Sequence, residues 1–482
     1  MALILGIDIG TTSTKAILFD SSKGIVAEAQ RDAGLVSRHA GWAEEDAGVW
    51  WTNVCGLVRE LVTGQSIAAV GVTGMVPCIV LSDAHGELLR PSIQQNDARA
   101  IDEIAELRAA FDVARTLART GAPITQQSIA PKLLWLARHE PDVWSRVALV
   151  QGSYDFIVSR LTGAVGVEAN WAVESGLYDL ETQTWADDVL AAAGIPSDML
   201  PPIRQPLDVA GLVRAAAAAE TGLAAGVPVM AGVADHVGAA FAAGVIDDGE
   251  LLIKLGGAGD ILMATDIPLI DARLFFDLHV IPGKYLPNGC MATSGSLIRW
   301  FQQEIAQGRP LRELDDEAEA VGAGAGGVLA LPYFLGEKTP LNDPNARGAF
   351  VGLHLGHTRA HLYRAVLEAI AYAFRHHIEV FTELGHAPTR IRVSDGGAKS
   401  ATWTQIIADI IGMPIEVVEG QGGAAVGAAF VAGMAVDGFS DWREIEGFTT
   451  VSATVQPHPA DVYERGYRAY RSLYPALKEV PL

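Results

Sequence analysis

The sequence predicts an α/β protein built from two large domains of duplicated topology that face one cleft. Three observations favour this class. The chain has 482 residues, which is long for one compact core, so two domains are expected. Short apolar runs that end in glycine or acidic turns alternate with stretches of helical periodicity. A strand, a glycine-rich turn and a second strand open the chain, and this pattern recurs after Asp247.

The opening pattern also suggests phosphate binding. Residues 3–9 and 15–19 are predicted strands, and the turn between them contains Thr11, Thr12 and Ser13. A glycine at the corner of such a turn lets the backbone approach an oligophosphate, and its N–H and hydroxyl groups can donate to phosphate oxygens. Lys15 follows the turn. Asp8, near the end of the first strand, is placed to hold Mg²⁺ directly or through water. An ordinary hairpin with a polar turn is the alternative.

Periodicity and turn signals place the remaining elements of the first half. Further strands are predicted at residues 25–30, 67–73, 79–82 and 227–231. Helices are predicted at residues 43–63, 102–118, 132–138 and 237–243. The domain boundary is expected at residues 245–249, which gives an N-terminal domain of residues 1–246 and a C-terminal domain of residues 247–482.

The second half repeats the order of the first. Strands are predicted at residues 250–255, 261–265, 390–394 and 415–418. Helices are predicted at residues 296–304, 314–321, 361–384, 402–411, 424–433 and 461–474. Residues 322–327 fit GxGxxG, but they follow a helix and precede an apolar run. A dinucleotide site needs the order strand, loop, helix, so we interpret this segment as a loop.

Asp235 is the strongest single candidate for a catalytic residue. It lies between a predicted strand and an Ala/Gly-rich helix, in apolar surroundings where an idle carboxylate would be costly. A general base that takes a proton from a substrate hydroxyl fits this position. A helix N-cap is the structural alternative. The neighbouring His236 either orients the substrate or the base, or occupies a helix face.

Composition excludes several classes of protein. The formal net charge is −22 and no Lys/Arg cluster interrupts it, so nucleic acid and anionic membranes are not expected partners. The cysteines Cys55, Cys78 and Cys290 form no CxxC pair, which favours a reduced, cytoplasmic compartment and no zinc site. No signal peptide or membrane span is expected. The sequence does not determine the oligomeric state, and a homodimer is compatible with it.

Several motifs together resemble the FGGY family of carbohydrate kinases. Residues 6–15 are similar to the family's first phosphate motif, residues 348–353 with 361–368 to its C-terminal signature, and residues 394–400 to its adenosine motif. The resemblance covers essentially the whole chain. It implies two actin-like ATPase (ribonuclease H-like) domains with a central cleft, and ATP-dependent phosphorylation of a small sugar.

Within that family the likeness is greatest to xylulokinases, through residues 42–51, 130–135 and 331–343. It implies D-xylulose as the substrate, ATP and Mg²⁺ as cofactors, Asp235 as the catalytic base and Asp8 as the metal residue. It also implies sugar contacts in the N-terminal domain, from Met75, Val76, Gln94, Asp97 and Asp235. Nucleotide and phosphate contacts are implied at Thr11, Thr12, Ser13, Lys15, Gly256, Gly257, Gly396, Gly397, Ala398 and Ser400.

Three departures from the xylulokinase pattern leave the substrate open. Val76 stands where a histidine is usual, and Gln94-Gln95 precedes Asn96-Asp97 where a tryptophan is usual. The second phosphate turn, residues 256–259, lacks the two hydroxyl residues of the usual Gly-Thr-Ser-Gly. A polar pocket discriminates strongly through paired hydroxyls. Another ketose or polyol (ribulose, erythrulose, glycerol or erythritol) is therefore an alternative, and a nucleotide-dependent binding protein is an alternative of another class.

Overall fold

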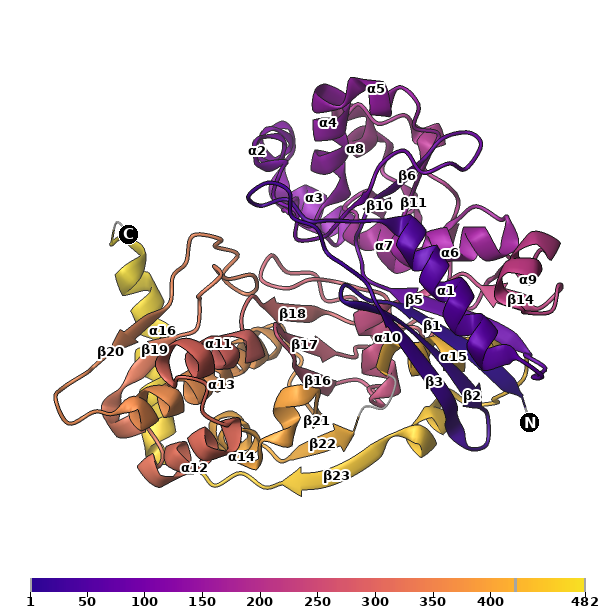
Figure 1. Ribbon diagram of the computed structural model, residues 1–482. Helices are drawn as coiled ribbons and strands as arrows, with labels where there is room; N and C mark the ends of the chain where they lie inside the picture. The colour runs from indigo at the N-terminus through magenta and orange to yellow at the C-terminus, as the bar shows by residue number, and fades with distance from the viewer. Residues whose placement is uncertain (1, 420–422, 481–482) are drawn as a thin grey trace. The chain divides into compact units, whose positions relative to one another are not determined.

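The computed structural model describes residues 2–419 and 423–480 (Figure 1). The chain divides into two compact units. The first consists of Met1–Ile246, Phe276–Tyr285 and Gln421–Phe448, and the second of Asp247–Phe275, Leu286–Gly420 and Thr449–Leu482. Two segments of the second half of the chain therefore fold with the first unit, which the sequence did not indicate.

The first unit is built around a mixed sheet in the order β13-β14-β5-β1-β2-β3, with the short β15 also paired to β5. β1, β5 and β14 are parallel, while β2, β3 and β13 are each antiparallel to their neighbours. The strands are β1 Leu3–Ile9, β2 Ser13–Asp20, β3 Gly24–Asp32, β5 Ala69–Gly74, β13 Val209–Leu212, β14 Pro228–Met230 and β15 Val233–Ala234.

The sheet of the second unit has the same spatial order and directions of strands, although β23 follows its neighbour β22 in the chain whereas its counterpart β13 precedes β14. Its order is β18-β17-β16-β21-β22-β23, and β16, β21 and β22 are parallel while the other pairs are antiparallel. The strands are β16 Glu250–Leu255, β17 Gly259–Met263, β18 Asn288–Met291, β21 Arg390–Ser394, β22 Ile415–Glu419 and β23 Thr450–Val455. This match, strand for strand and direction for direction, confirms the duplication that the recurring turn predicted.

Helices cover the first sheet. α1 packs against β2 and β3, α6 against β5, and α15 against β1 and β5. The approach of α15 is very close, because a Cβ atom on Gly71 would lie 2.1 Å from the carbonyl oxygen of Ala428. Only glycine fits at that point of β5. The helices are α1 Ala47–Val62, α6 Ser153–Thr162, α9 Ala215–Thr221, α10 Asp235–Ala242 and α15 Gly423–Ala435.

Further helices of the first unit gather at the top of Figure 1. They are α2 Ile101–Ala110, α3 Val113–Thr120, α4 Ile129–His139, α5 Pro141–Trp144, α7 Ala169–Glu174 and α8 Asp187–Ala192. The single helix predicted at residues 102–118 is in fact α2 and α3. Asp112 separates them, because its carboxylate caps α3 by accepting from the N–H of Arg115 at 3.0 Å.

The first unit also contains small two-stranded sheets. They pair β4 Glu44–Glu45 with β7 Ser92–Ile93, β6 Val80–Ser82 with β8 Leu149–Gln151, β9 Val167–Glu168 with β12 Ile203–Arg204, and β10 Tyr178–Asp179 with β11 Thr184–Trp185. β7 leads directly into the loop that contains Gln94 and Asp97, two of the predicted site residues.

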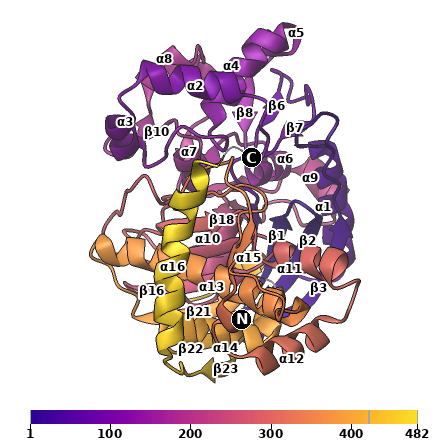
Figure 2. The same ribbon diagram turned by 90° about the vertical axis from the view of Figure 1, so that its left-hand side faces the viewer.

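The second unit is organised around the long helix α13, Arg359–Glu383, in which every residue from Tyr363 to Phe374 is buried. α12, α14 and α16 pack against it, and Figure 2 shows α16 on the side facing the viewer. The other elements are α11 Gly295–Trp300, α12 Leu311–Val321, α14 Ala401–Ile411, α16 Asp461–Lys478, β19 Leu329–Leu331 and β20 Ala349–Val351. Among the described residues, no helix combines the length and apolarity that crossing a membrane requires.

Candidate functional site

The carboxyl edge of the first sheet brings Asp8 and Asp235 to one place. Thr73 on β5 is in register with Asp8 on one side and with Val233 on the other. Asp235 begins α10 two residues after Val233. Because neighbouring strands lie about 4.8 Å apart, β1, which carries Asp8, and β15, which leads into Asp235, are separated by roughly 10 Å. This is the edge at which ligands bind in open α/β sheets.

Gly232 makes this placement of Asp235 possible. Its φ is +119°, and a Cβ atom there would lie 2.6 Å from a ring carbon of Tyr154. This unusual backbone separates β14 from β15 and lets the chain reach the sheet edge before turning into α10. Asp235 is the first residue of α10, and the capping position before it is Ala234. Asp235 therefore does not fill the N-cap role that the sequence left open.

The carboxylate of Asp235 is partly exposed and partly held. Its side chain keeps 39% of its surface accessible. Oδ1 accepts from the backbone N–H of His236 at 2.7 Å and lies 3.2 Å from Nδ1 of the same histidine. An exposed, oriented carboxylate is what a general base requires.

His236 connects Asp235 to two further carboxyl groups. Its Nε2 lies 2.8 Å from Oδ2 of Asp277 and 3.6 Å from Oε1 of Glu174. Burial by itself lowers the pKa of His236, but the charge of Asp277 and the hydrogen bonds with Asp235 and Asp277 outweigh it, so the pKa is raised well above its usual range. This cluster could not be predicted from local sequence, because Asp277 lies 41 residues from His236 along the chain.

The first glycine-hydroxyl turn is formed as predicted. The N–H of Gly10 donates to the carbonyl of Ser13 at 3.0 Å and closes the turn between β1 and β2. Thr11 and Thr12 are exposed at its tip. Lys15 is in register with Asp8 across the two strands, and its ammonium pairs with Glu28 at 2.6 Å. The phosphate role of this turn stays a prediction.

Met75 and Val76 continue from the end of β5 and are both buried. The N–H of Met75 donates to the carbonyl of Ile9 at 3.0 Å, and its own carbonyl accepts from the Ser153 hydroxyl at 2.8 Å. The Thr11 hydroxyl lies 3.9 Å from the sulfur of Met75. The structure therefore places the predicted sugar residue Met75 against the predicted phosphate turn.

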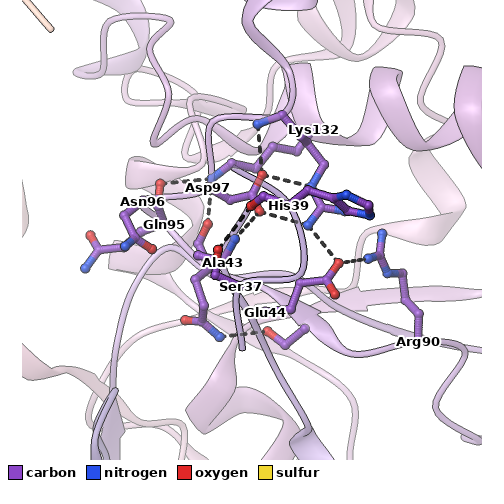
Figure 3. Close-up of polar contacts among 12 residues, drawn as sticks. Ser37, His39, Ala43, Glu44, Arg90, Gln95, Asn96, Asp97 and Lys132 are labelled. Carbon is purple, nitrogen blue, oxygen red and sulfur yellow. Dashed lines mark hydrogen bonds and ion pairs between the residues drawn. The ribbon is translucent and has the colours of Figure 1, made fainter. Parts of the chain in front are cut away.

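The loop with Gln94 and Asp97 is fixed by charged side chains (Figure 3). The Lys132 ammonium donates to the carbonyls of Gln94 and Gln95, at 3.0 Å each. The carboxylate of Asp97 has no exposed surface, and it accepts from the N–H of Ala43 at 2.6 Å and from Arg99. Burial raises the pKa of Asp97, but the hydrogen bonds from Arg99 and Ala43 outweigh it, and the pKa is lowered.

The same network of hydrogen bonds and ion pairs explains what holds this loop in place. It does not explain how the loop would bind a sugar. Arg99 also donates to Glu44 at 2.7 Å, and Arg90 pairs with Glu44 as well (Figure 3). Gln94 is buried and donates to the Ser92 hydroxyl at 3.3 Å. Direct sugar contacts from Gln94 and Asp97 stay predictions. Lys132 and Arg99 are the positioning residues that the sequence did not single out.

In the second unit, the predicted phosphate turn lies between β16 and β17. The carbonyls of Gly256 and Gly257 accept from the first N–H groups of α11, with Gly295 N–H at 2.8 Å and Ser294 N–H at 2.9 Å. A Cβ atom on Gly257 would lie 3.2 Å from a guanidinium nitrogen of Arg299. This turn therefore has a cationic side chain beside it although it lacks hydroxyls.

The predicted nucleotide segment lies next to that turn, because β16 and β21 are parallel neighbours and end together, with Lys254 in register with Ser394. Gly396, Gly397 and Ala398 form a 3₁₀ turn after β21. Ser400 caps α14 by accepting from Trp403 N–H at 3.1 Å, and its hydroxyl donates to Asp315 at 2.8 Å. The structure gives Ser400 a structural role, and its nucleotide contact stays a prediction.

Glu337, which lies in the segment of residues 331–343, has a structural role. Glu337 is buried, and its carboxylate accepts from the N–H groups of Ala292 and Lys338, at 2.8 Å each. Burial raises the pKa of Glu337 to about 8. Glu337 therefore attaches the loop in which it lies to the end of β18.

Comparison with known proteins agrees with this architecture. Residues 3–242 match the N-terminal domain and residues 260–436 the C-terminal domain of the FGGY family of carbohydrate kinases. The crystal structure of xylulose kinase from Rhodospirillum rubrum superposes with a TM-score of 0.95 at 46% identity, over 99% of both chains. Xylulose kinase from Bacillus subtilis (strain 168) is 29% identical over 100% of this chain and 98% of its own. Glycerol kinase from Nocardia farcinica is 30% identical over 95% of each chain.

Two sheets of one spatial strand order, with glycine turns and aspartates at their carboxyl edges, thus define a phosphotransferase of the actin-like ATPase fold. Membership in a kinase family implies that ATP supplies the phosphoryl group and a sugar receives it. The chain belongs to the FGGY family of carbohydrate kinases.

Proposed function

We propose that the protein transfers the γ-phosphoryl group of ATP to the primary hydroxyl of D-xylulose and releases D-xylulose 5-phosphate and ADP. The observation that carries the proposal is the placement of Asp235, which lies partly exposed at the carboxyl edge of the first sheet and is held by His236. Full-length similarity to proteins named xylulose kinase supports the choice of sugar.

Asp235 acts as the general base in this proposal. Its carboxylate accepts the proton of the sugar hydroxyl while the hydroxyl oxygen bonds to the γ-phosphorus. The bond from that phosphorus to the β,γ-bridging oxygen breaks, and ADP leaves with the bridging oxygen. Positioning and electrostatic stabilisation provide most of the acceleration in phosphoryl transfer. A well-placed base contributes typically about 10²–10⁴-fold.

The turn after β1 provides phosphate contacts in the proposal. Thr11 and Thr12 are exposed there, and Ser13 and Lys15 follow on β2. The carboxylate of Asp8 and these hydroxyls are all oxygen ligands, which fits Mg²⁺. Bound Mg²⁺ would neutralise charge on the ATP phosphates. We expect Asp8→Asn to bind Mn²⁺, an electron-spin-resonance probe for Mg²⁺, more weakly in the presence of ADP than the unchanged protein does.

The two units divide the substrates between them. We assign the sugar to the first unit, through Met75, Val76 and the loop of Gln94 and Asp97. We assign the adenosine to the second unit, where the two glycine turns after β16 and β21 lie side by side. Arg299 beside Gly257 offers a positive charge to a phosphate at the turn that lacks hydroxyls.

A different ketose or polyol is the second candidate substrate. The observation that favours it is the pair of residues that depart from the xylulokinase pattern, since Val76 is buried and apolar and Gln94 brings an amide. The similarity to a glycerol kinase keeps polyols in consideration. A site that lacks a hydrogen-bond partner for one hydroxyl tolerates substrates without that hydroxyl.

Release of ADP, measured by a coupled assay with ATP and Mg²⁺, tests the function. The panel contains D-xylulose, D-ribulose, erythrulose, ketohexoses, glycerol and erythritol. We expect the highest kcat/KM with D-xylulose. A preference for another compound would replace D-xylulose in the proposal and would point to Val76 and Gln94 as its cause.

The role of the base is tested with Asp235→Asn. We expect this variant to bind ATP normally and to lose about 10²-fold or more in kcat. Asp198→Asn is the matched control, because Asp198 is an exposed aspartate of the same unit. Near-normal turnover by Asp235→Asn would remove it from the role of base.

A further inference from the structure

His236 lies between carboxylates on both sides of its ring. Nδ1 is 3.2 Å from Oδ1 of Asp235, and Nε2 is 2.8 Å from Oδ2 of Asp277. The side chain of His236 is 18% exposed and that of Asp277 is 1% exposed. Of the two carboxylates that flank His236, that of Asp235 is thus the solvent-accessible one, and Asp235 is the residue that we propose as the base.

This arrangement favours a doubly protonated ring. A neutral imidazole has one N–H donor and one acceptor nitrogen, whereas ionised carboxylates only accept. With a carboxylate facing each nitrogen, a neutral ring would bring a lone pair against one of them. The imidazolium donates to both. The raised pKa of His236 agrees with this geometry, since the neighbouring carboxylates outweigh the effect of burial.

Asp277 is brought to His236 by a firmly attached segment. Phe276–Tyr285 belongs to the first unit although the chain on either side of it belongs to the second. Asn170 holds it by accepting from the N–H of Leu278 at 2.7 Å and donating to the Leu278 carbonyl at 3.0 Å. His279 lies 3.0 Å from the carbonyl of Val245. Asp277 therefore has little freedom to leave the histidine.

The remaining acidic groups near the histidine are Glu174, at the end of α7, and Glu168, on β9. Burial first, and then the charge of Asp277, raises the pKa of Glu174 well above its usual range. Burial raises the pKa of Glu168 to about 8, and the Tyr154 hydroxyl donates to it at 2.9 Å. Because these two carboxyls are driven toward the neutral form, the contacts of the ring with Asp235 and Asp277 are the ones that carry the inference.

We propose that His236, kept as an imidazolium by Asp277, is a positioning residue that orients Asp235 and keeps it ionised for proton transfer. The inference rests on the proposed role of Asp235 as base. It adds His236, and Asp277 from a distant part of the sequence, to the residues that support the reaction. A fixed cation beside a carboxylate lowers the pKa of that carboxylate. Asp235 then stays ionised, and so able to accept a proton, at a lower pH than a half-buried aspartate without a neighbouring cation.

The competing interpretation is a metal site, because single atoms of Glu174, His236 and Asp277 all lie within 4.8 Å of one another. Metal binding needs the lone pair of a ring nitrogen. The 2.8 Å contact from Nε2 to Asp277 is hydrogen-bond distance, and a protonated Nε2 has no lone pair to give. The geometry favours the hydrogen-bonded row over the metal.

The experiment compares pH profiles of kcat for the unchanged protein, Asp277→Asn and His236→Asn. Asp277→Asn removes a charge that raises the pKa of His236, so the imidazolium is lost at lower pH. We expect the alkaline limb of kcat to move down by about 1–3 pH units, the usual effect of one close charge. His236→Asn removes the cation from Asp235, so the acid limb should move up. KM for ATP should change little in both.

Asp179→Asn is the matched control. Asp179 is a buried aspartate of the same unit that pairs with Arg119 at 2.5 Å and has no contact with His236 among the described residues. It should lose stability without a shift of either limb. Because a variant can fail to fold, the histidine is also observed directly. Nuclear magnetic resonance of the unchanged protein with labelled histidine should show His236 doubly protonated at pH 7.5.

The outcomes separate the two proposals. If Asp235→Asn keeps its activity, the proposed base is wrong. If Asp235→Asn is inactive while the limbs for His236→Asn and Asp277→Asn coincide with those of the unchanged protein, the positioning role is overturned. A neutral His236 ring at pH 7.5 overturns it too. So does stoichiometric Zn²⁺ that is lost in His236→Asn, because this would make the cluster a metal site.

Discussion

Arg99 donates three hydrogen bonds to the carboxylate of Asp97, two residues before it in the chain. Its backbone N–H and Nε reach Oδ1 at 3.0 and 2.8 Å, and Nη2 reaches Oδ2 at 2.8 Å. Neither side chain has exposed surface. The guanidinium also lies 3.9 Å from the ring centre of Trp42. The planar, forked guanidinium suits this role and a lysine does not.

We therefore expect Arg99→Met to destabilise the protein by about 3–5 kcal/mol, the usual cost of leaving one partner of a buried ion pair alone. KM for the sugar should rise as well, because the loop of Gln94 and Asp97 loses its anchor. Urea unfolding and steady-state kinetics measure the two effects. Arg138→Met is the matched control, since Arg138 and Glu106 form an exposed pair at 2.8 Å, and solvent screens such a pair so that it adds little stability. Equal stability of the two variants would contradict the prediction.

Lys132 should make stability depend on pH. Burial lowers the pKa of its ammonium from 10.5 to about 7. Between these values the unfolded chain binds the proton and the folded protein does not, so stability rises with pH in that window. The difference in urea midpoint between the unchanged protein and Lys132→Met should therefore increase in favour of the unchanged protein from pH 7 to pH 10.

The control for Lys132 is Lys23→Met, because Lys23 is exposed. Its difference from the unchanged protein should stay level over the same pH range. Lys132→Met should also raise KM for the sugar, since the lysine donates to the carbonyls of Gln94 and Gln95. A pH-independent difference for Lys132→Met would mean that this lysine keeps its proton when buried.

The sequence predicted what depends on local pattern. The hairpin around Gly10, the start of α10 near Asp235 and the second glycine turn all come from residues adjacent in the chain. It did not predict the pairing of His236 with Asp277, nor that residues 421–448 fold with the first unit. These depend on tertiary packing between distant segments, and an isolated aspartate in an apolar run carries no local sign of its partner. Arg99 was missed for a related reason, since the burial that makes it matter is not encoded in its spacing from Asp97.

Gly71 is the contact point between β5 and α15. A Cβ atom there would lie 2.1 Å from the Ala428 carbonyl oxygen, which is backbone and cannot rotate away. Gly71→Ala should destabilise the first unit by at least about 1–3 kcal/mol, the usual cost of overpacking. Thermal unfolding measures it. Gly34→Ala is the control, because a Cβ atom at Gly34 meets nothing within 4 Å. If both variants unfold at the same temperature, α15 does not pack on β5 as closely as described.

Gly396 tests whether the second unit binds the nucleotide. A Cβ atom there meets no protein atom within 4 Å, and its φ is not positive, so the fold accepts alanine. If the backbone of this 3₁₀ turn touches the nucleotide, as we propose, the added methyl group collides with the ligand and not with the protein. Gly396→Ala should then keep its unfolding temperature and raise KM for ATP several-fold, while KM for the sugar stays the same.

The comparison for Gly396→Ala is Gly447→Ala, another glycine with open space around it, in the first unit. It should change neither constant. Calorimetric titration of each variant with ADP measures nucleotide binding separately from catalysis. Unchanged ADP affinity in Gly396→Ala would remove this glycine from the nucleotide site. A loss of sugar affinity without a loss of ADP affinity would reverse the assignment of the two substrates to the two units, because the only atom added lies in the second.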